Sequence, residues 1–81
     1  MSKVSIVYRI YPKENYNSER LKSKLMELGA KGVQEEEVAF GIKVVKALFV
    51  YEDSEGSTEI EDSIKKLEDV NELDVEEESL I

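Results

Sequence analysis

The sequence predicts an α+β domain in which two helices cover one face of a four-stranded antiparallel sheet. Residues 3–11 alternate with a period of two, whereas residues 17–28 and 58–67 place apolar side chains three or four positions apart. Two further segments with strand character, 33–39 and 42–51, lie between the helices, and a fourth strand follows the second helix. The order strand, helix, strand, strand, helix, strand is that of the ferredoxin-like βαββαβ sandwich, with the expected strand order 4-1-3-2.

The first strand and the first helix have clear expected ends. Pro12 ends the strand because proline cannot donate a hydrogen bond to a neighbouring strand. Asn17 or Ser18 can cap the helix, and Gly29 can close it in the left-handed conformation. Met26 is expected to fill space in the core. The inward-facing apolar residues of the two elements are Val4, Ile6, Tyr8, Ile10, Leu21, Leu25 and Leu28.

The segment 42–51 is the most apolar part of the chain and is predicted to be a central strand. Both of its faces are apolar, although the helices would cover only one. Long side chains such as Lys46 must therefore lie across the second face, or another molecule must cover it. A turn at Phe40 and Gly41 joins this strand to the segment 33–39. The three glutamates at 35–37 suit an edge strand, because charged edges discourage pairing between molecules; an acidic functional site is the alternative.

The second helix is expected to begin with a capping box formed by Thr58 and Glu61. Acidic residues fill its first turn and lysines its last, which matches the helix dipole at both ends. A fourth, acidic edge strand is expected around Leu73 and to run to about Glu77. We expect residues 1–81 to form a single domain, because a chain of this length supports one modest core.

The charge of the chain is divided unevenly. Residues 1–51 hold nine basic and six acidic side chains, whereas residues 52–81 hold two basic and thirteen acidic ones, within a net charge of −8. The acidic half repels phosphate backbones, so we expect no direct nucleic-acid contact and a basic protein surface as the partner. The alternative is a solvated face that keeps a small protein soluble. No signal peptide or membrane-spanning stretch is expected, and the predicted location is cytoplasmic.

Residues that carry covalent chemistry are scarce. The chain has no Cys and no His, and it lacks phosphate-loop, dinucleotide, nucleophile-elbow and metal-ligand motifs. Its carboxylates give no sign of burial, and an exposed Glu with a pKa near 4 is a poor acid at neutral pH. We therefore predict no catalytic residue, no cofactor and no metal. An acylphosphatase-like hydrolase would need an Arg in the loop at 13–16, which has none. An RNA-recognition motif would need exposed aromatic residues, for which the candidates are Tyr8, Tyr11, Phe49 and Tyr51.

Three stretches carry a family resemblance. Val-Ala-Phe-Gly-Ile-Lys at 38–43, the acidic Gly-containing stretch at 51–58 and Leu-Glu-Asp-Val-Asn-Glu-Leu-Asp-Val at 67–75 resemble archaeal translation elongation factor 1-beta. They are more distantly similar to the C-terminal exchange domain of the eukaryotic factor. The resemblance implies exchange of GDP for GTP on elongation factor 1-alpha, the GTPase that delivers aminoacyl-tRNA. The residues that it implies at the GTPase interface are Ala39, Phe40, Gly41, Lys43, Glu52, Asp53, Leu80 and Ile81.

The C-terminus departs from the eukaryotic pattern, in which the next-to-last residue is a lysine. Leu80 stands at that position here, so a lysine that displaces the magnesium ion is missing. Exchange itself needs no acid or base on the factor, only a surface that binds the nucleotide-free GTPase more tightly than the GDP-bound form. Phe40 is a plausible anchor for that surface, and the alternative is a ring tucked under the sheet. The competing function is a small ferredoxin-like regulatory or assembly module that self-associates through the open sheet face. We expect a monomer or a weak homodimer.

Overall fold

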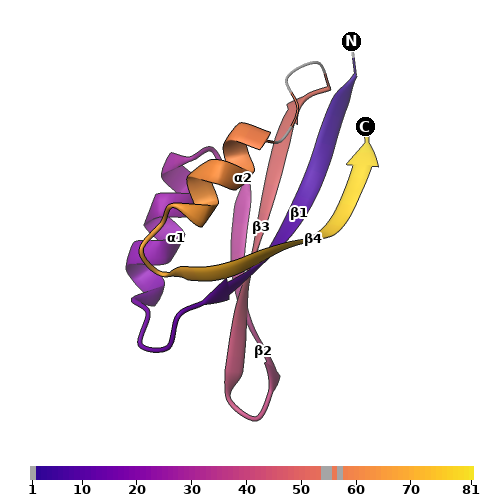
Figure 1. Cartoon of the computed structure of the whole chain (residues 1–81). Coiled ribbons are helices and arrows are strands. Elements are labelled where there is room, and N and C mark those ends of the chain that lie inside the picture. The colour runs from indigo at the N-terminus through magenta and orange to yellow at the C-terminus, as the bar shows by residue number, and fades with distance from the viewer. Residues whose placement is uncertain (1, 54–55, 57) are drawn as a thin grey trace.

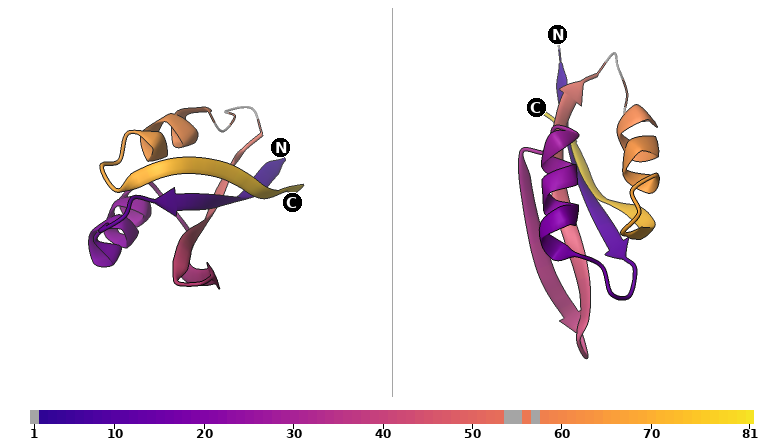
Figure 2. Two further views of the ribbon diagram at one scale, coloured as in Figure 1. Left: turned by 60° about the horizontal axis from the view of Figure 1, so that its bottom comes forward. Right: turned by 90° about the vertical axis from the view of Figure 1, so that its left-hand side faces the viewer.

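The computed structural model describes residues 2–53, 56 and 58–81. Two helices lie on the same face of a four-stranded sheet, as Figures 1 and 2 show from three directions. No helix in the described residues is long and apolar enough to cross a membrane. The elements are β1 (Lys3–Pro12), α1 (Ser18–Glu27), β2 (Gly32–Ala39), β3 (Ile42–Glu52), α2 (Thr58–Lys65) and β4 (Val70–Leu80).

The sheet has the strand order β2-β3-β1-β4, and all three neighbouring pairs are antiparallel. This confirms the predicted fold and places the two acidic strands, β2 and β4, at the edges. Three register shifts interrupt the pairing of the edge strands, and one of them lies near the start of β4, between its pairs with Tyr11 and Pro12. Val38 is the extra residue opposite β3, and Glu76 is the extra residue opposite β1. Because a bulge bends its strand and redirects one side chain, both edges depart from a regular pleat.

The core lies between the sheet and the helices, where the two predicted patterns meet. Tyr8 and Phe49 pack edge to face there, with ring centroids 5.8 Å apart, and both side chains are buried. Every element except β2 supplies buried residues to the core. Strand β2 contributes through Val33, which packs against the rim of the core, so all six elements take part. The buried members of this cluster are Ile6, Tyr8, Ile10, Leu21, Leu25, Ala30, Val45, Ala47, Phe49, Ile64 and Val70.

The structure corrects several expected details of the helices and of the last strand. Met26 is 53% exposed and does not fill the core, because it points about a quarter-turn away from the buried Leu25. Helix α2 begins at Thr58 itself, so Thr58 is not its cap, and residue 57 lies outside the described residues. Glu61 accepts a hydrogen bond from the Tyr8 hydroxyl at 3.3 Å. Strand β4 continues to Leu80, three residues beyond its expected end. The expected caps of α1 are confirmed.

The open face of the sheet is covered by charged side chains of the chain itself. Val44 is fully buried, although it lies on the face opposite the helices. Lys46 lies on the same face, and its Nζ is 3.1 Å from Glu36 and 3.2 Å from the bulged Glu76, which also binds Arg9. The hydrogen bonds to Glu36 and Glu76 raise the pKa of Lys46. These ion pairs hold Lys46 across the second face of β3, on which Leu48 and Val50 are partly buried.

A candidate partner-binding site at two ends of the sheet

Phe40 and Gly41 form the two-residue turn between β2 and β3. Their φ angles are 43° and 81°, and positive values at both central residues define a type I′ turn. Glycine adopts this conformation readily, whereas phenylalanine is strained in it. The Phe40 side chain is fully exposed, with a relative accessibility of 103%, so it is not tucked under the sheet.

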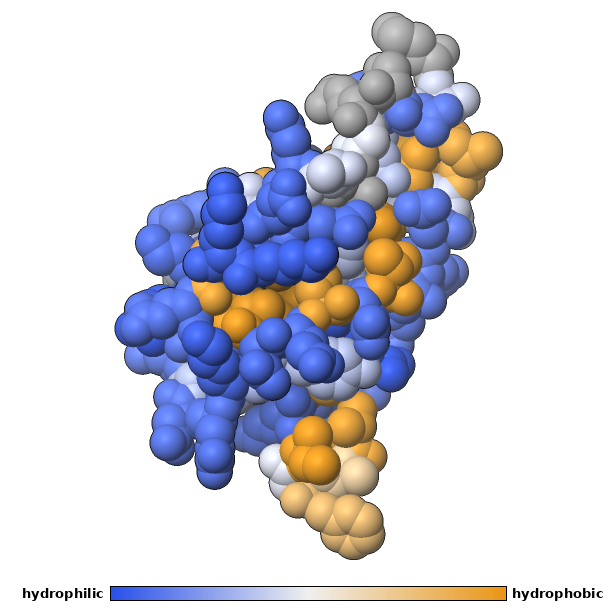
Figure 3. All heavy atoms as spheres, viewed as in Figure 1, coloured by the Kyte–Doolittle hydropathy of each residue, from blue (hydrophilic) through white to orange (hydrophobic). Residues whose placement is uncertain are grey.

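Two further apolar residues flank Phe40 at the end of the hairpin. Val38 and Ile42 are both exposed, and with Phe40 they form an apolar surface that we call the hairpin tip. Figure 3 shows it as the hydrophobic patch at the lower end of the molecule. Contiguous exposed apolar patches often mark sites that bind a partner.

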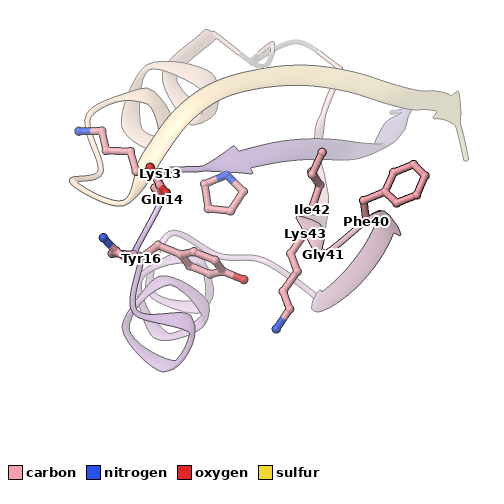
Figure 4. Close-up of a pocket in the computed structure, with 9 residues that line it drawn as sticks. Lys13, Glu14, Tyr16, Phe40, Gly41, Ile42 and Lys43 are labelled. Carbon is pink, nitrogen blue, oxygen red and sulfur yellow. The ribbon is translucent and has the colours of Figure 1, made fainter.

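An open groove of about 420 Å³ lies beside the hairpin tip. The connection between β1 and α1 forms one wall, with Lys13, Glu14 and Tyr16, and the hairpin forms the other, with Lys43. In Figure 4 the Tyr16 hydroxyl points across the groove toward the hairpin, whereas the Phe40 ring projects away from it. The hairpin tip thus presents an aromatic ring on one side and an open groove with both polar and apolar walls on the other.

Glu35 connects the two walls of the groove. Its Oε2 accepts hydrogen bonds from the Tyr16 hydroxyl and, at 2.9 Å, from Ser18 Oγ, and its Oε1 lies 3.9 Å from Lys43 Nζ. The hydrogen bonds from Tyr16 and Ser18 lower the pKa of Glu35. Burial, and then the bond to Glu35, raises the pKa of Tyr16 to about 12. At neutral pH the Glu35 carboxylate is therefore ionised and the Tyr16 hydroxyl is neutral.

The three consecutive glutamates of β2 thus have different environments. Glu35 faces the helices and Glu36 binds Lys46 on the open face, because successive side chains of a strand point to opposite sides. Glu37 is exposed. The interpretation of this run as a charged edge describes Glu37 but misses the contacts of the other two.

The other predicted interface residues lie at the opposite end of the sheet. Glu52 ends β3, Asp53 N donates a hydrogen bond to the Ser2 carbonyl at 3.0 Å, and Ile81 N donates to the Lys3 carbonyl at 2.8 Å. The side chains of Leu80 and Ile81 are exposed. Figure 1 shows both chain termini together at this end, far from the hairpin tip.

The eight residues predicted from the resemblance therefore form two groups rather than one patch. The structure brings Ala39, Phe40, Gly41 and Lys43 together at the hairpin end, and it brings Glu52, Asp53, Leu80 and Ile81 together at the terminal end. Strand β3 runs from one group to the other in a molecule with principal extents of 41 × 22 × 17 Å. A partner that contacts both groups has to extend along the sheet.

Asp69 is a buried carboxylate that no pattern in the sequence predicts. It is 7% exposed and accepts two hydrogen bonds from Arg20, at 2.9 Å from Nε and 2.8 Å from Nη2. Its carbonyl accepts from Lys13 N at 2.8 Å. The bonds from Arg20 lower the pKa of Asp69, so it is ionised at neutral pH and cannot act as an acid there. Asp69 joins the α2–β4 turn to the start of α1.

The aromatic residues do not form a base-stacking surface. Tyr8 and Phe49 are buried under the helices, and Tyr51 lies on the same face of β3 as Phe49. Tyr11, on the opposite face of β1, is the one candidate left for stacking among the four. A metal-binding cluster of three or more carboxylates is absent from the described part of the chain.

Comparison with known proteins identifies the family. The family model described as the EF-1 guanine nucleotide exchange domain matches residues 5–81. Elongation factor 1-beta of Aeropyrum pernix is 40% identical over 86 residues, which covers 94% of this chain and 93% of the relative. Elongation factor 1-beta of Caldivirga maquilingensis is 33% identical over 84 residues, which covers 94% and 92% respectively. With a match that spans nearly the whole described fold, the chain belongs to the EF-1 guanine nucleotide exchange domain family.

Proposed function

We propose that this protein promotes the exchange of GDP for GTP on elongation factor 1-alpha by binding and stabilising the nucleotide-free GTPase. A factor that prefers the empty GTPase weakens GDP binding by the same factor, because coupling between two ligands is reciprocal. Such a factor performs no covalent chemistry of its own. This fits a chain that has no Cys and no His, and in which the buried carboxylate found among the described residues, that of Asp69, is held by Arg20.

The observation that carries the proposal is the fully exposed Phe40 in a type I′ turn. A folded domain gains nothing from an aromatic ring that touches no neighbour, and it bears the strain of a positive φ at that residue. An anchor that enters a pocket on a partner accounts for both features, because aromatic rings supply large contact area with few rotatable bonds. Ala39, Gly41 and Lys43 surround the anchor in this proposal.

The terminal end forms the second part of the proposed interface. Glu52 and Asp53 offer carboxylates, and Leu80 and Ile81 offer exposed apolar side chains in place of the eukaryotic lysine. Leu80 and Ile81 contribute contact area, but neither carries a charge that could compete for the magnesium site of the GTPase. The proposed single domain, residues 1–81, rests on the one core to which all six elements contribute. The expected cytoplasmic location stays a prediction.

The test is the release of labelled GDP from the cognate elongation factor 1-alpha, with and without this protein. We expect faster release with the wild type, and a much higher half-saturating concentration of the exchange factor with Phe40→Ala. Met26→Ala is the matched control, because Met26 is also an exposed apolar side chain but lies on α1. The proposal fails if the folded wild type does not accelerate release, or if Phe40→Ala is as active as Met26→Ala.

A self-associating assembly module is the competing function. Charged side chains from all four strands already lie across the middle of the open sheet face, where Arg9, Lys46, Glu36 and Glu76 are paired with one another. A second copy docking there would have to desolvate these ions, which opposes association. Sedimentation at low protein concentration tests this directly, since an assembly module would form a stable oligomer. The exchange factor that we propose would sediment as a monomer or a weak dimer.

A further inference from the structure

The hairpin of β2 and β3 projects beyond the rest of the molecule before it reaches Phe40. Figure 1 shows its tip extending past both helices, and Figure 2 shows the same projection from the side. Two-stranded ribbons on their own are only marginally stable in water. The Val38 bulge also interrupts the pairing of this part of β2 with β3. The orientation of the tip therefore depends on contacts closer to the body of the protein.

Glu35 supplies such a contact at the base of the projecting segment. Its carboxylate binds Tyr16 and Ser18 of the body through one oxygen, and lies near Lys43 of the hairpin through the other. The side chain is 22% exposed, so these bonds are partly shielded from water. Hydrogen bonds that involve an ionised group are roughly twice as strong as neutral ones.

We propose that Glu35 is a positioning residue for the hairpin tip, which fixes the tip relative to α1 and so sets the direction from which Phe40 meets its partner. The inference rests on the proposed function. Glu35 lies five positions before Phe40 and on the side of β2 that faces the helices. It acts through the hairpin rather than by touching the partner itself. Fixing the tip before binding lowers the entropy that is lost on association.

The first experiment compares Glu35→Gln with Glu37→Gln in the GDP-release assay. Both variants remove one negative charge from the same face of the same strand, but Glu37 is exposed and lies outside the Tyr16–Ser18 contact. We expect Glu35→Gln to raise the half-saturating concentration of the exchange factor about tenfold, because a tenfold change corresponds to about 1.4 kcal/mol, which is the size of one hydrogen bond to a charged group. Glu37→Gln should stay within about twofold of the wild type.

Tyr16→Phe provides a second variant that leaves the hairpin sequence intact. It removes one of the hydroxyl donors to Glu35, and it should raise the half-saturating concentration in the same direction as Glu35→Gln. Thermal denaturation of each variant checks that the assay temperature lies well below its Tm. If Glu35→Gln and Tyr16→Phe both raise the half-saturating concentration, the effect is assigned to the hydrogen bond between Tyr16 and Glu35.

A double-mutant cycle distinguishes positioning from a general loss of stability. If Glu35 acts through Phe40, then Glu35→Gln has no further effect once Phe40 has been replaced by alanine. A full, additive tenfold loss in the Phe40→Ala background would overturn the proposal. Equal activity of Glu35→Gln and Glu37→Gln would overturn it as well.

Measurements on the free protein separate this inference from the proposed exchange activity. Backbone order parameters from NMR relaxation should fall at Phe40 and Gly41 in Glu35→Gln and stay unchanged in Glu37→Gln. Unchanged order parameters in Glu35→Gln would refute the positioning role whatever the GTPase assay gives. Failure of the wild type to accelerate GDP release, with lower order parameters in Glu35→Gln, would instead refute the exchange function and leave the mechanical role of Glu35 supported.

Discussion

Replacing Phe40 with asparagine should make the protein more stable and less active at the same time. Asn-Gly is the preferred pair for a type I′ turn, because asparagine tolerates a positive φ better than phenylalanine does. A side chain in that region costs about 1 to 3 kcal/mol, and relief of the lower value would raise Tm by about 4 to 8 °C in a domain of this size. The fully exposed ring makes no contact whose loss would offset this gain.

The expected loss of binding follows from the area of the ring. A phenylalanine that buries about 150 Å² contributes about 4 kcal/mol at 25 cal/mol per Å². Ordering the side chain on binding costs about 1 kcal/mol, which leaves about 3 kcal/mol, or a factor of roughly 100 in affinity. Phe40→Asn should therefore raise the half-saturating concentration for GDP release about 100-fold.

Thermal denaturation and the GDP-release assay on the same preparation test both expectations. Phe40→Tyr is the matched control, because it keeps an aromatic ring at a strained position and should leave both quantities close to their wild-type values. A lower Tm for Phe40→Asn would refute our account of the turn. A higher Tm with full exchange activity would refute the anchoring role of Phe40.

Three further predictions concern the core, a buried ion pair and the terminal end. Leu25→Ala should lower the free energy of unfolding by about 2 to 5 kcal/mol in urea denaturation, whereas Met26→Ala should change it by less than about 0.5 kcal/mol. Asp69→Asn should lower Tm at pH 7. Because the folded-state pKa of Asp69 lies below its unfolded value, its stabilisation is complete above about pH 4 and lost as the pH falls through the folded-state pKa, so the variant's stability should depend less on pH there. Replacing Leu80 and Ile81 together by alanine should slow GDP release without changing Tm, as both are exposed.

The fold could be predicted from the sequence because its signals are local. Alternation in residues 3–11 and the leucine stripe of α1 each mark one face of one element, and the order of elements then restricts the topology to few choices. The burial of Tyr8 and Leu25 follows from the same periodicity. Met26 was misjudged because it sits next to the stripe in sequence, although the helix turns it away.

The candidate site was predicted less completely, because its contacts join distant parts of the chain. Glu35 meets Tyr16 from 19 positions away, and Asp69 meets Arg20 from 49 positions away, so no local pattern reports either pair. The conformation of Phe40 was also hidden, since only the following glycine hints at a positive φ. The sequence could have predicted the separation of the two groups of interface residues, because Glu52 lies ten positions after Ile42 in a single extended strand.

The length of β3 also restricts the size of any partner that touches both ends of this protein. At about 3.3 Å per residue, its 11 residues span about 35 Å, and hydrogen bonds to strands on both sides keep that span fixed. The two contact points on the partner must therefore lie a similar distance apart. Inserting two residues in β3 and two in each paired strand would keep every side chain on its face while lengthening the span by about 7 Å. In such a variant each end could still bind, but no partner of unchanged dimensions could hold both ends at once.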